Sequence, residues 1–274
     1  MNRRVVRTLE VTLTLFVLLT GEALAQTPKE QAWQILQGAA ASAKAETRAN
    51  NARALGLVTN DPKAAELLES ALKDKDSSVR AAAATSLGII KSKSSIPKLI
   101  AAAQSDTDGA VVMAIARALI QMGENQGYAV YYAIVTGEMK SGKGLIASQQ
   151  KMMSDMLKNP KSLANEAFQQ GMGFVPFGGL ALGAFQAVRS TGKNDVLVKA
   201  AAVRTLGGDP DPRSEKALVT ATSDKEWVVR AAAFDALARR GNSAVVADIV
   251  NGLTDSQEVV KLTAAAAIVC LSHA

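Results

Sequence analysis

The sequence contains very few of the side chains that build catalytic and metal sites. Its 274 residues include one histidine, His273, and one cysteine, Cys270. A single histidine excludes a multi-histidine metal site, and no Ser/His/Asp triad is expected around the penultimate residue. A lone cysteine excludes an internal disulfide, and because Cys270 lies in an apolar run, residues 264–271, we expect it to be buried. We therefore expect no enzyme activity, no catalytic residue, no metal and no cofactor.

Apolar runs long enough to cross a membrane are also lacking. The apolar run at residues 11–19 is shorter than the roughly 20 residues that a spanning helix needs. It follows Arg3, Arg4 and Arg7 and precedes Ala23-Leu24-Ala25, which resembles a signal-peptidase cleavage site. We predict that residues 1–25 are a signal peptide and that the protein is exported, periplasmic or secreted, after cleavage near Ala25. An uncleaved anchor is the alternative.

The sequence has no block of charge of one sign. The formal net charge is +6, but basic and acidic residues are interspersed along the chain. This pattern is typical of a solvated surface, so we expect no nucleic-acid partner. Residues 137–144, GEMKSGKG, nearly match a phosphate-binding loop, but Gly144 stands where a hydroxyl would bind magnesium. We expect no nucleotide there.

What the sequence does contain is an internal repeat with a spacing of 31 or 32 residues. Residues 76–88 read DSSVRAAAATSLG, and Arg80, Leu87 and Gly88 match Arg48, Leu55 and Gly56. Copies of this segment occupy residues 44–56, 76–88, 108–119, 195–207, 226–237 and 257–268. Repeats of this length indicate stacked supersecondary units.

Each repeat reads as a pair of helices. In the second repeat, Asp76 or Ser77 can cap a helix that passes through Leu87, and we expect Gly88 to loosen its end. Ser95 and Pro97 then begin the second helix, with proline in its first turn. The repeat therefore predicts an all-α fold, an α-solenoid of helical hairpins.

The pattern D-x-x-V-R-x-A-A-x-x-x-L-G, followed by a helix that starts with proline, resembles the HEAT repeat. It is most similar to the short bacterial form also found in phycobilin (PBS) lyases. The resemblance covers residues 44–137 and 194–274 and implies an α-solenoid that binds other macromolecules. A protein-binding or scaffolding role is the expectation that follows, and a lyase-like enzyme is a less favoured one.

The repeats divide the chain into regions. Residues 26–137 hold an N-terminal helix and repeats 1–3, and residues 194–274 hold repeats 4–6. Thr27-Pro28-Lys29-Glu30 forms a capping box, and we expect a helix over residues 28–43 to cover the first repeat. The last repeat stops after its first helix, which either caps the stack or leaves an edge for self-association.

One position of the repeat is basic in five copies, at Arg48, Arg80, Lys199, Arg230 and Lys261. In three copies an acid precedes it by four residues, as Asp76 precedes Arg80, which is the spacing of an ion pair within a helix. We interpret the five side chains as a ladder that ties neighbouring repeats together. An anion-binding stripe is the alternative, although Val112 interrupts it.

Residues 138–193 interrupt the repeats. Val111 and Val198 occupy equivalent positions 87 residues apart, where one repeat would give 31 or 32. The sequence pattern of residues 138–193 predicts further helices, one of them with methionines on one face. It also predicts a glycine-rich bend around residues 171–179. Of the ten aromatic residues after residue 25, seven lie in residues 128–185.

These aromatic and methionine residues are the candidate interaction site, because such side chains dominate many interfaces. Three interpretations stay open: the segment packs on the solenoid, it binds a protein or hydrophobic ligand through an exposed loop, or it contacts a membrane surface. A protein partner is expected most. The candidate residues are Tyr128, Tyr131, Tyr132, Met152, Met153, Met156, Phe168, Phe174, Phe177 and Phe185.

Overall fold

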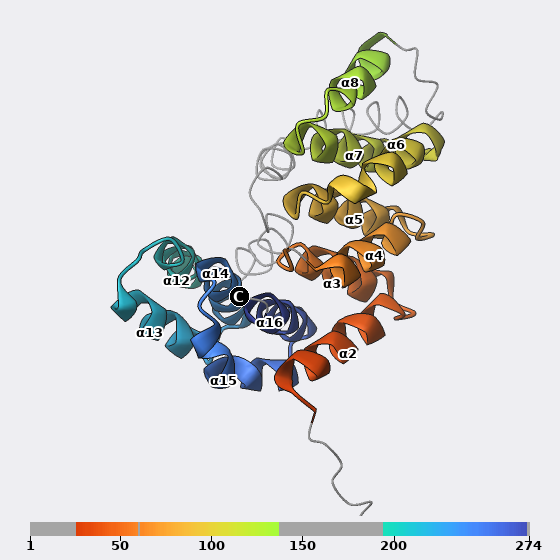
Figure 1. Ribbon diagram of the computed structural model, residues 1–274. Helices are drawn as coiled ribbons and strands as arrows, with labels where there is room; N and C mark the ends of the chain where they lie inside the picture. The colour runs from red at the N-terminus through yellow and green to blue at the C-terminus, as the bar shows by residue number, and fades with distance from the viewer. Residues whose placement is uncertain (1–25, 60, 137–193, 273–274) are drawn as a thin grey trace, which may run out of the picture.

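The computed structural model describes residues 26–59, 61–136 and 194–272, and within them the regular elements are all helices (Figure 1). This confirms the predicted all-α fold. The first part of the chain forms α2 (Pro28–Ala40), α3 (Ala45–Leu55), α4 (Pro62–Ala71), α5 (Ser77–Ile89), α6 (Ile96–Ser105), α7 (Gly109–Gln121) and α8 (Gln126–Thr136). The second part forms α12 (Asn194–Leu206), α13 (Pro212–Ala221), α14 (Trp227–Arg240), α15 (Val246–Ile249) and α16 (Glu258–Leu271).

The helices form two layers of a curved stack. Helices α12, α14, α16, α3, α5 and α7 contact one another in that order and line the inner side of the curve (Figure 1). Helices α13, α15, α2, α4 and α6 form the outer layer (Figure 1). The core between the layers consists mostly of alanine, leucine and valine. Alanine favours helix formation and leaves little side chain between neighbouring helices, so it suits a closely packed stack.

The helices begin where the sequence predicts caps. Asp76 accepts a hydrogen bond from the backbone N–H of Ser78, at 2.9 Å, and is the N-cap of α5. At the start of α2, the hydroxyl of Thr27 accepts from the N–H of Glu30, whose carboxylate accepts from the N–H of Thr27. This is the predicted capping box, which satisfies two backbone donors that a helix leaves unpaired.

The two ends of the described chain meet in the middle of the stack. Helix α2 packs against α3 and also against α16, and α16 packs against α3 (Figure 1). Ala32 and Leu36 of α2 are fully buried, and the hydroxyl of Thr47 on α3 donates to the carboxylate of Glu258 on α16 at 2.9 Å. Helix α2 thus supplies the outer-layer helix that the sixth repeat lacks.

This arrangement corrects two expectations. The N-terminal helix does cover the first repeat, but it is an internal layer element between two repeats and not a terminal cap. The C-terminal helix neither caps the stack nor leaves an edge, because α2 and α3 cover it. Helices α8 and α12 lie at the two ends of the stack, and in the sequence they flank residues 137–193, which lie outside the described residues (Figure 1).

Cys270 is only half-buried, contrary to the expectation of full burial. It lies in the last turn of α16, where its Sγ is 3.9 Å from the carbonyl oxygen of Ala238. Together with Leu57 and Ile89 it borders a surface groove of about 300 Å³. The apolar run around it correctly indicates a buried helix, but the helix end reaches the surface.

The glycine of the repeat motif allows the inner helices to approach closely. We expected Gly88 to loosen a helix end. It is the penultimate residue of α5, which continues through Ile89, and it faces α7. A Cβ added at Gly88 would lie 2.8 Å from Cα of Ala118, and one added at Gly207 would lie 3.0 Å from Cβ of Ala236. Both glycines therefore mark contacts between neighbouring repeats.

We expect Gly88→Ala to destabilise the protein by about 1–3 kcal/mol, because α5 or α7 must move to admit the methyl group. Gly38→Ala is a matched control: it lies within α2, and an added Cβ meets nothing within 4 Å. There alanine should stabilise by roughly 0.5–1 kcal/mol through its helix propensity. Urea unfolding of the two variants measures both effects, and equal changes would contradict the close approach of α5 and α7.

Candidate functional site

The basic ladder is a series of arginine–aspartate pairs between repeats. Arg48 Nε lies 2.6 Å from one oxygen of Asp74, and its Nη2 lies 2.8 Å from the other. Arg80 contacts Asp106 in the same two-pronged way, at 2.6 and 3.0 Å. In the second half Arg230 repeats the geometry with Asp255, at 2.6 and 2.8 Å, and Lys199 pairs with Asp224. Each aspartate belongs to the connection that leads into the next repeat.

Each arginine also holds the connection before its own helix. Arg80 Nη1 donates to the carbonyl oxygens of Asp74 and Lys75, at 2.9 and 3.2 Å. Arg230 does the same to Asp224 and Lys225, at 2.8 and 3.2 Å. One planar guanidinium therefore fixes two successive connections, which a lysine amine cannot do with the same geometry.

These partners differ from those that the sequence suggested. The spacing of Asp76 and Arg80 predicts an ion pair within one helix, but Asp76 caps α5 and Arg80 contacts Asp106, 26 residues further on. The interpretation as a ladder between repeats agrees with the structure. The anion-binding stripe does not, because carboxylates of the protein already occupy Arg48, Arg80 and Arg230.

The ladder stops at the junction of the two chain halves. Lys261 on α16 occupies the ladder position, but the connection that would hold its partner, residues 41–44, contains no acidic residue. The Thr47–Glu258 hydrogen bond and the packing of α2 join the repeats at this point.

The pairing lowers the pKa of the aspartates. The hydrogen bond from Arg48 is the main cause that holds the pKa of Asp74 below its ordinary value, and partial burial opposes it. At Asp255 burial acts to raise the pKa, but the hydrogen bond and charge of Arg230 and a backbone N–H outweigh it, so this pKa is also lowered. Both side chains are therefore carboxylates at neutral pH.

A buried charged cluster lies between α12 and α14. Asp235 is 2% exposed and pairs with Arg239 at 2.9 Å. Burial raises the pKa of Asp235, although the charges of Arg239 and Arg204 oppose this rise. Buried Nε of Arg204 has no hydrogen-bond partner among the described residues. The charge of Arg204 links α12 to the cluster on α14, and Arg239 lines the same groove as Cys270.

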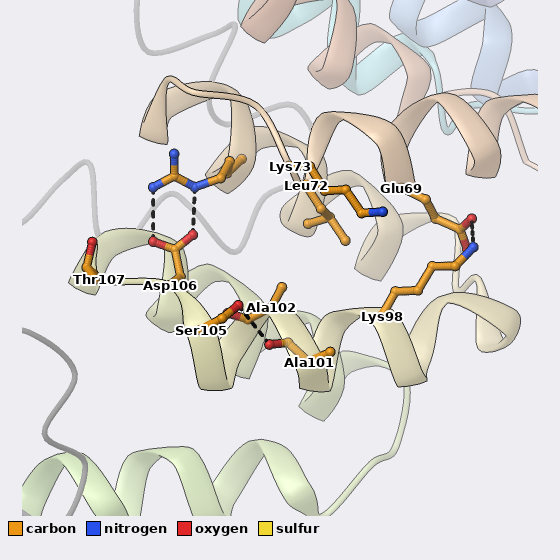
Figure 2. A pocket seen from close by; sticks show the side chains of 10 residues that line it. Glu69, Leu72, Lys73, Lys98, Ala101, Ala102, Ser105, Asp106 and Thr107 are labelled. Carbon is orange, nitrogen blue, oxygen red and sulfur yellow. Dashed lines mark hydrogen bonds and ion pairs between the residues drawn. The ribbon is translucent and has the colours of Figure 1, made fainter.

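The largest described groove lies in the outer layer, between α4 and α6, with a volume of about 510 Å³. Figure 2 shows two ion pairs at its opposite ends, Arg80–Asp106 and Glu69–Lys98. Lys73 lies between them, and the apolar part of the lining consists of Leu72, Ala101 and Ala102 (Figure 2). Sequence reasoning missed this groove, because its residues come from α4, α5, α6 and the connections that follow α4 and α6, which share no motif.

Glu69 is the acidic group of the groove. Burial acts to raise its pKa, but hydrogen bonds from Lys98 and Ser95 and the charges of Lys98 and Lys73 together lower it. The hydroxyl of Ser95 donates to Glu69 at 2.7 Å and is itself fully buried. Each carboxylate oxygen of Glu69 thus already accepts a hydrogen bond from the protein, one from Ser95 and one from Lys98.

Most of the predicted interaction residues fall outside the described part of the chain. Tyr128 and Tyr131 lie on α8, where Tyr128 is 53% exposed and Tyr131 is half-buried against the core. Tyr132 also belongs to α8. The structure does not describe the rest, which are Met152, Met153, Met156, Phe168, Phe174, Phe177 and Phe185.

In residues 26–59, 61–136 and 194–272, no helix has the length and hydropathy to cross a membrane. The same residues hold no group of three or more His, Cys, Asp or Glu side chains arranged to bind a metal ion.

Comparison with known proteins gives the family. A family model for HEAT repeats matches residues 22–123 and 185–269, which together are more than half of the chain, so the chain belongs to the HEAT-repeat family. Human deoxyhypusine hydroxylase in complex with glycerol is similar at 19% identity, over 91% of this chain and 86% of that one, with a TM-score of 0.30. An engineered protein is similar at 20% identity, over 88% and 96%, with a TM-score of 0.26. A search of curated proteins finds no match.

The lowered pKa values predict acid sensitivity. Asp74 and Asp255 have a lower pKa in the folded chain than in the unfolded one, so their stabilisation is complete above the ordinary value of about 4 and is lost as the pH falls through the folded values. We expect Asp74→Asn to lower stability at pH 7 and to flatten the fall between about pH 5 and 3, since asparagine does not titrate.

Asp248→Asn, at an exposed site on α15, removes a carboxylate without touching an arginine pair and is the control. Thermal unfolding of both variants across this pH range is the measurement. An unchanged slope in Asp74→Asn would contradict the role assigned to the pair.

Proposed function

We propose that the protein is a non-enzymatic scaffold that holds a partner protein outside the cytoplasm. The observation that carries the proposal is the position of the exposed large apolar side chains of the described residues. They are Tyr128 on α8, 53% exposed, and Val198 on α12, 70% exposed, and these helices lie at the two ends of the stack. Repeat proteins normally end in repeats with a polar outer face, so apolar ends support contact with another surface.

Membership of the HEAT-repeat family supports the same proposal. Stacked repeats form extended curved surfaces, which such proteins use mainly to bind other macromolecules. The arginine–aspartate pairs favour a fixed curvature, because each guanidinium holds two successive connections. A surface with a fixed shape loses little conformational entropy when a partner binds.

Export is the second part of the proposal. The capping box of α2 begins at Thr27, the second residue after the predicted cleavage site, and Gln31 Nε2 donates to the carbonyl oxygen of Gln26 at 3.1 Å. Cleavage after Ala25 would therefore leave the cap of α2 complete. Since α2 packs in the middle of the stack, the mature N-terminus would be held by the fold.

The export proposal predicts a mature chain that begins at Gln26. Mass spectrometry of the protein purified from its native cells should show a fragment that starts Gln26-Thr27-Pro28, and fractionation should place it outside the cytoplasm. Ala25→Asp should block cleavage, because the signal peptidase requires a small residue there. A native chain that starts at Met1 in the cytoplasm would contradict export.

The scaffold proposal predicts partner capture that depends on the ends of the stack. Cross-linking in the native envelope fraction should recover a specific protein with the full chain. Recovery should fall about fivefold or more in the double variant Tyr128→Ser/Val198→Ser, as expected for apolar anchors at an interface. The melting temperature should not fall, because both side chains are already exposed.

Lys216→Ala, at an exposed site in the middle of outer helix α13, is the control and should capture normally. A small molecule that co-purifies in native mass spectrometry, in place of a protein, would favour the hydrophobic-ligand alternative. Flotation with liposomes would favour the membrane alternative.

A further inference from the structure

The groove between α4 and α6 carries one more positive charge than the protein neutralises. Five charged side chains line it: Glu69, Lys73, Arg80, Lys98 and Asp106. The two carboxylates are taken by Lys98 and Arg80. The side chain of Lys73 is exposed and has no ion pair or hydrogen bond among the described residues, although its charge helps to lower the pKa of Glu69. The groove therefore has an unneutralised amine beside an apolar surface.

The second half of the molecule offers an internal comparison. Asp61 and Asp211, and likewise Arg80 and Arg230, are equivalent residues 150 positions apart. By the same offset of 150, the position equivalent to Lys73 is occupied by Ser223, and the position equivalent to Ala101 is occupied by Asn251. The amide of Asn251 lies 3.4 Å from the hydroxyl of Ser223, so these two side chains meet between α13 and the outer segment that follows α15.

Residues that stacking requires recur in both halves of the molecule, whereas a residue without a counterpart is particular to one groove. The pair of Arg80 with Asp106 recurs as Arg230 with Asp255, so it serves the repeat. Lys73 has no such recurrence: at the equivalent place the protein uses an uncharged residue that is bonded across the outer layer. Stacking of the repeats therefore does not account for the amine of Lys73.

We propose that the α4–α6 groove binds a short acidic segment of a partner protein, with one carboxylate of the segment paired to Lys73. The apolar surface of Leu72, Ala101 and Ala102 contacts the small side chains that flank this carboxylate. The hydroxyl of Thr107 lines the same groove and can donate to the peptide backbone of the segment. The hydroxyl of Ser105 already donates to the carbonyl oxygen of Ala101 at 3.0 Å, so it can accept from a peptide N–H. The occupant is acidic and not basic, because both carboxylates of the groove are already paired.

The volume of about 510 Å³ suits a segment of a few residues, since it falls within the range of ligand sites, roughly 300–1,000 Å³. The inference rests on the proposed scaffold function and names the chemistry of the partner. It places this contact on the outer layer, whereas Tyr128 and Val198 belong to α8 and α12, the helices at the ends of the stack (Figure 1).

The test uses the full chain with alanine methyl groups labelled for NMR and the peptide acetyl-Ala-Ala-Glu-Ala-Ala-amide as the probe. The peptide should shift the methyl signals of Ala101 and Ala102 saturably. Lys73→Gln should raise the dissociation constant about three- to fivefold, the size of an exposed charge pair. Lys75→Gln removes the same charge two residues away, outside the groove lining, and should leave binding nearly unchanged.

Three results would overturn the proposal: equal effects of Lys73→Gln and Lys75→Gln, equal affinity for the peptide in which Gln replaces Glu, or shifts confined to methyl groups outside the groove. Acetate at the same concentration, if it alone reproduced the shifts, would reduce the site to a general anion site. Because the peptide test needs no partner, its failure is distinguishable from failure of partner capture by the ends of the stack.

Discussion

The arrangement of the described molecule depends on one packing interaction, the burial of α2 between α3 and α16. Without it, the two sets of repeats would each end in an uncovered apolar helix face, because all but one of the residues from Leu262 to Leu271 are buried. The ladder of arginine–aspartate pairs cannot replace this contact. The connection that would hold the partner of Lys261, residues 41–44, contains no acidic residue. The junction thus relies on apolar packing, where the other repeats add ionic pairs.

This constraint explains why the stack is continuous although the repeats are not continuous in the sequence. The fully buried residues Ala32 and Leu36 belong to α2, the first helix of the described residues, and α16 is the last. Any fragment that lacks either helix would expose apolar surface at the middle of the stack. The two halves are therefore parts of one folding unit, and the sequence interruption falls at the ends of the stack.

Local features of the sequence are enough to predict the helices. Contacts between residues that are distant in the sequence are not predicted by such features. The repeat and the caps at Thr27 and Asp76 indicate helices because the signals lie within one turn of the chain. The predicted partner of Arg80 is wrong, because a spacing of four residues favours an ion pair within one helix. That spacing carries no information about a carboxylate 26 residues away. The position of α16 was missed for the same reason. The α4–α6 groove is harder still to predict from the sequence, because residues of two repeats line it.

The repeat itself helps to separate structural from functional charge. A side chain that recurs at the same position in both halves, as Arg80 does at Arg230, contributes to stacking and so carries little information on binding. A charge without a counterpart, such as Lys73 opposite Ser223, has no stacking role to explain it. Its hydrated amine costs little in an exposed groove, so the groove can hold it without a partner of its own. An acidic segment would give the amine a partner and would cover the alanine surface beside it.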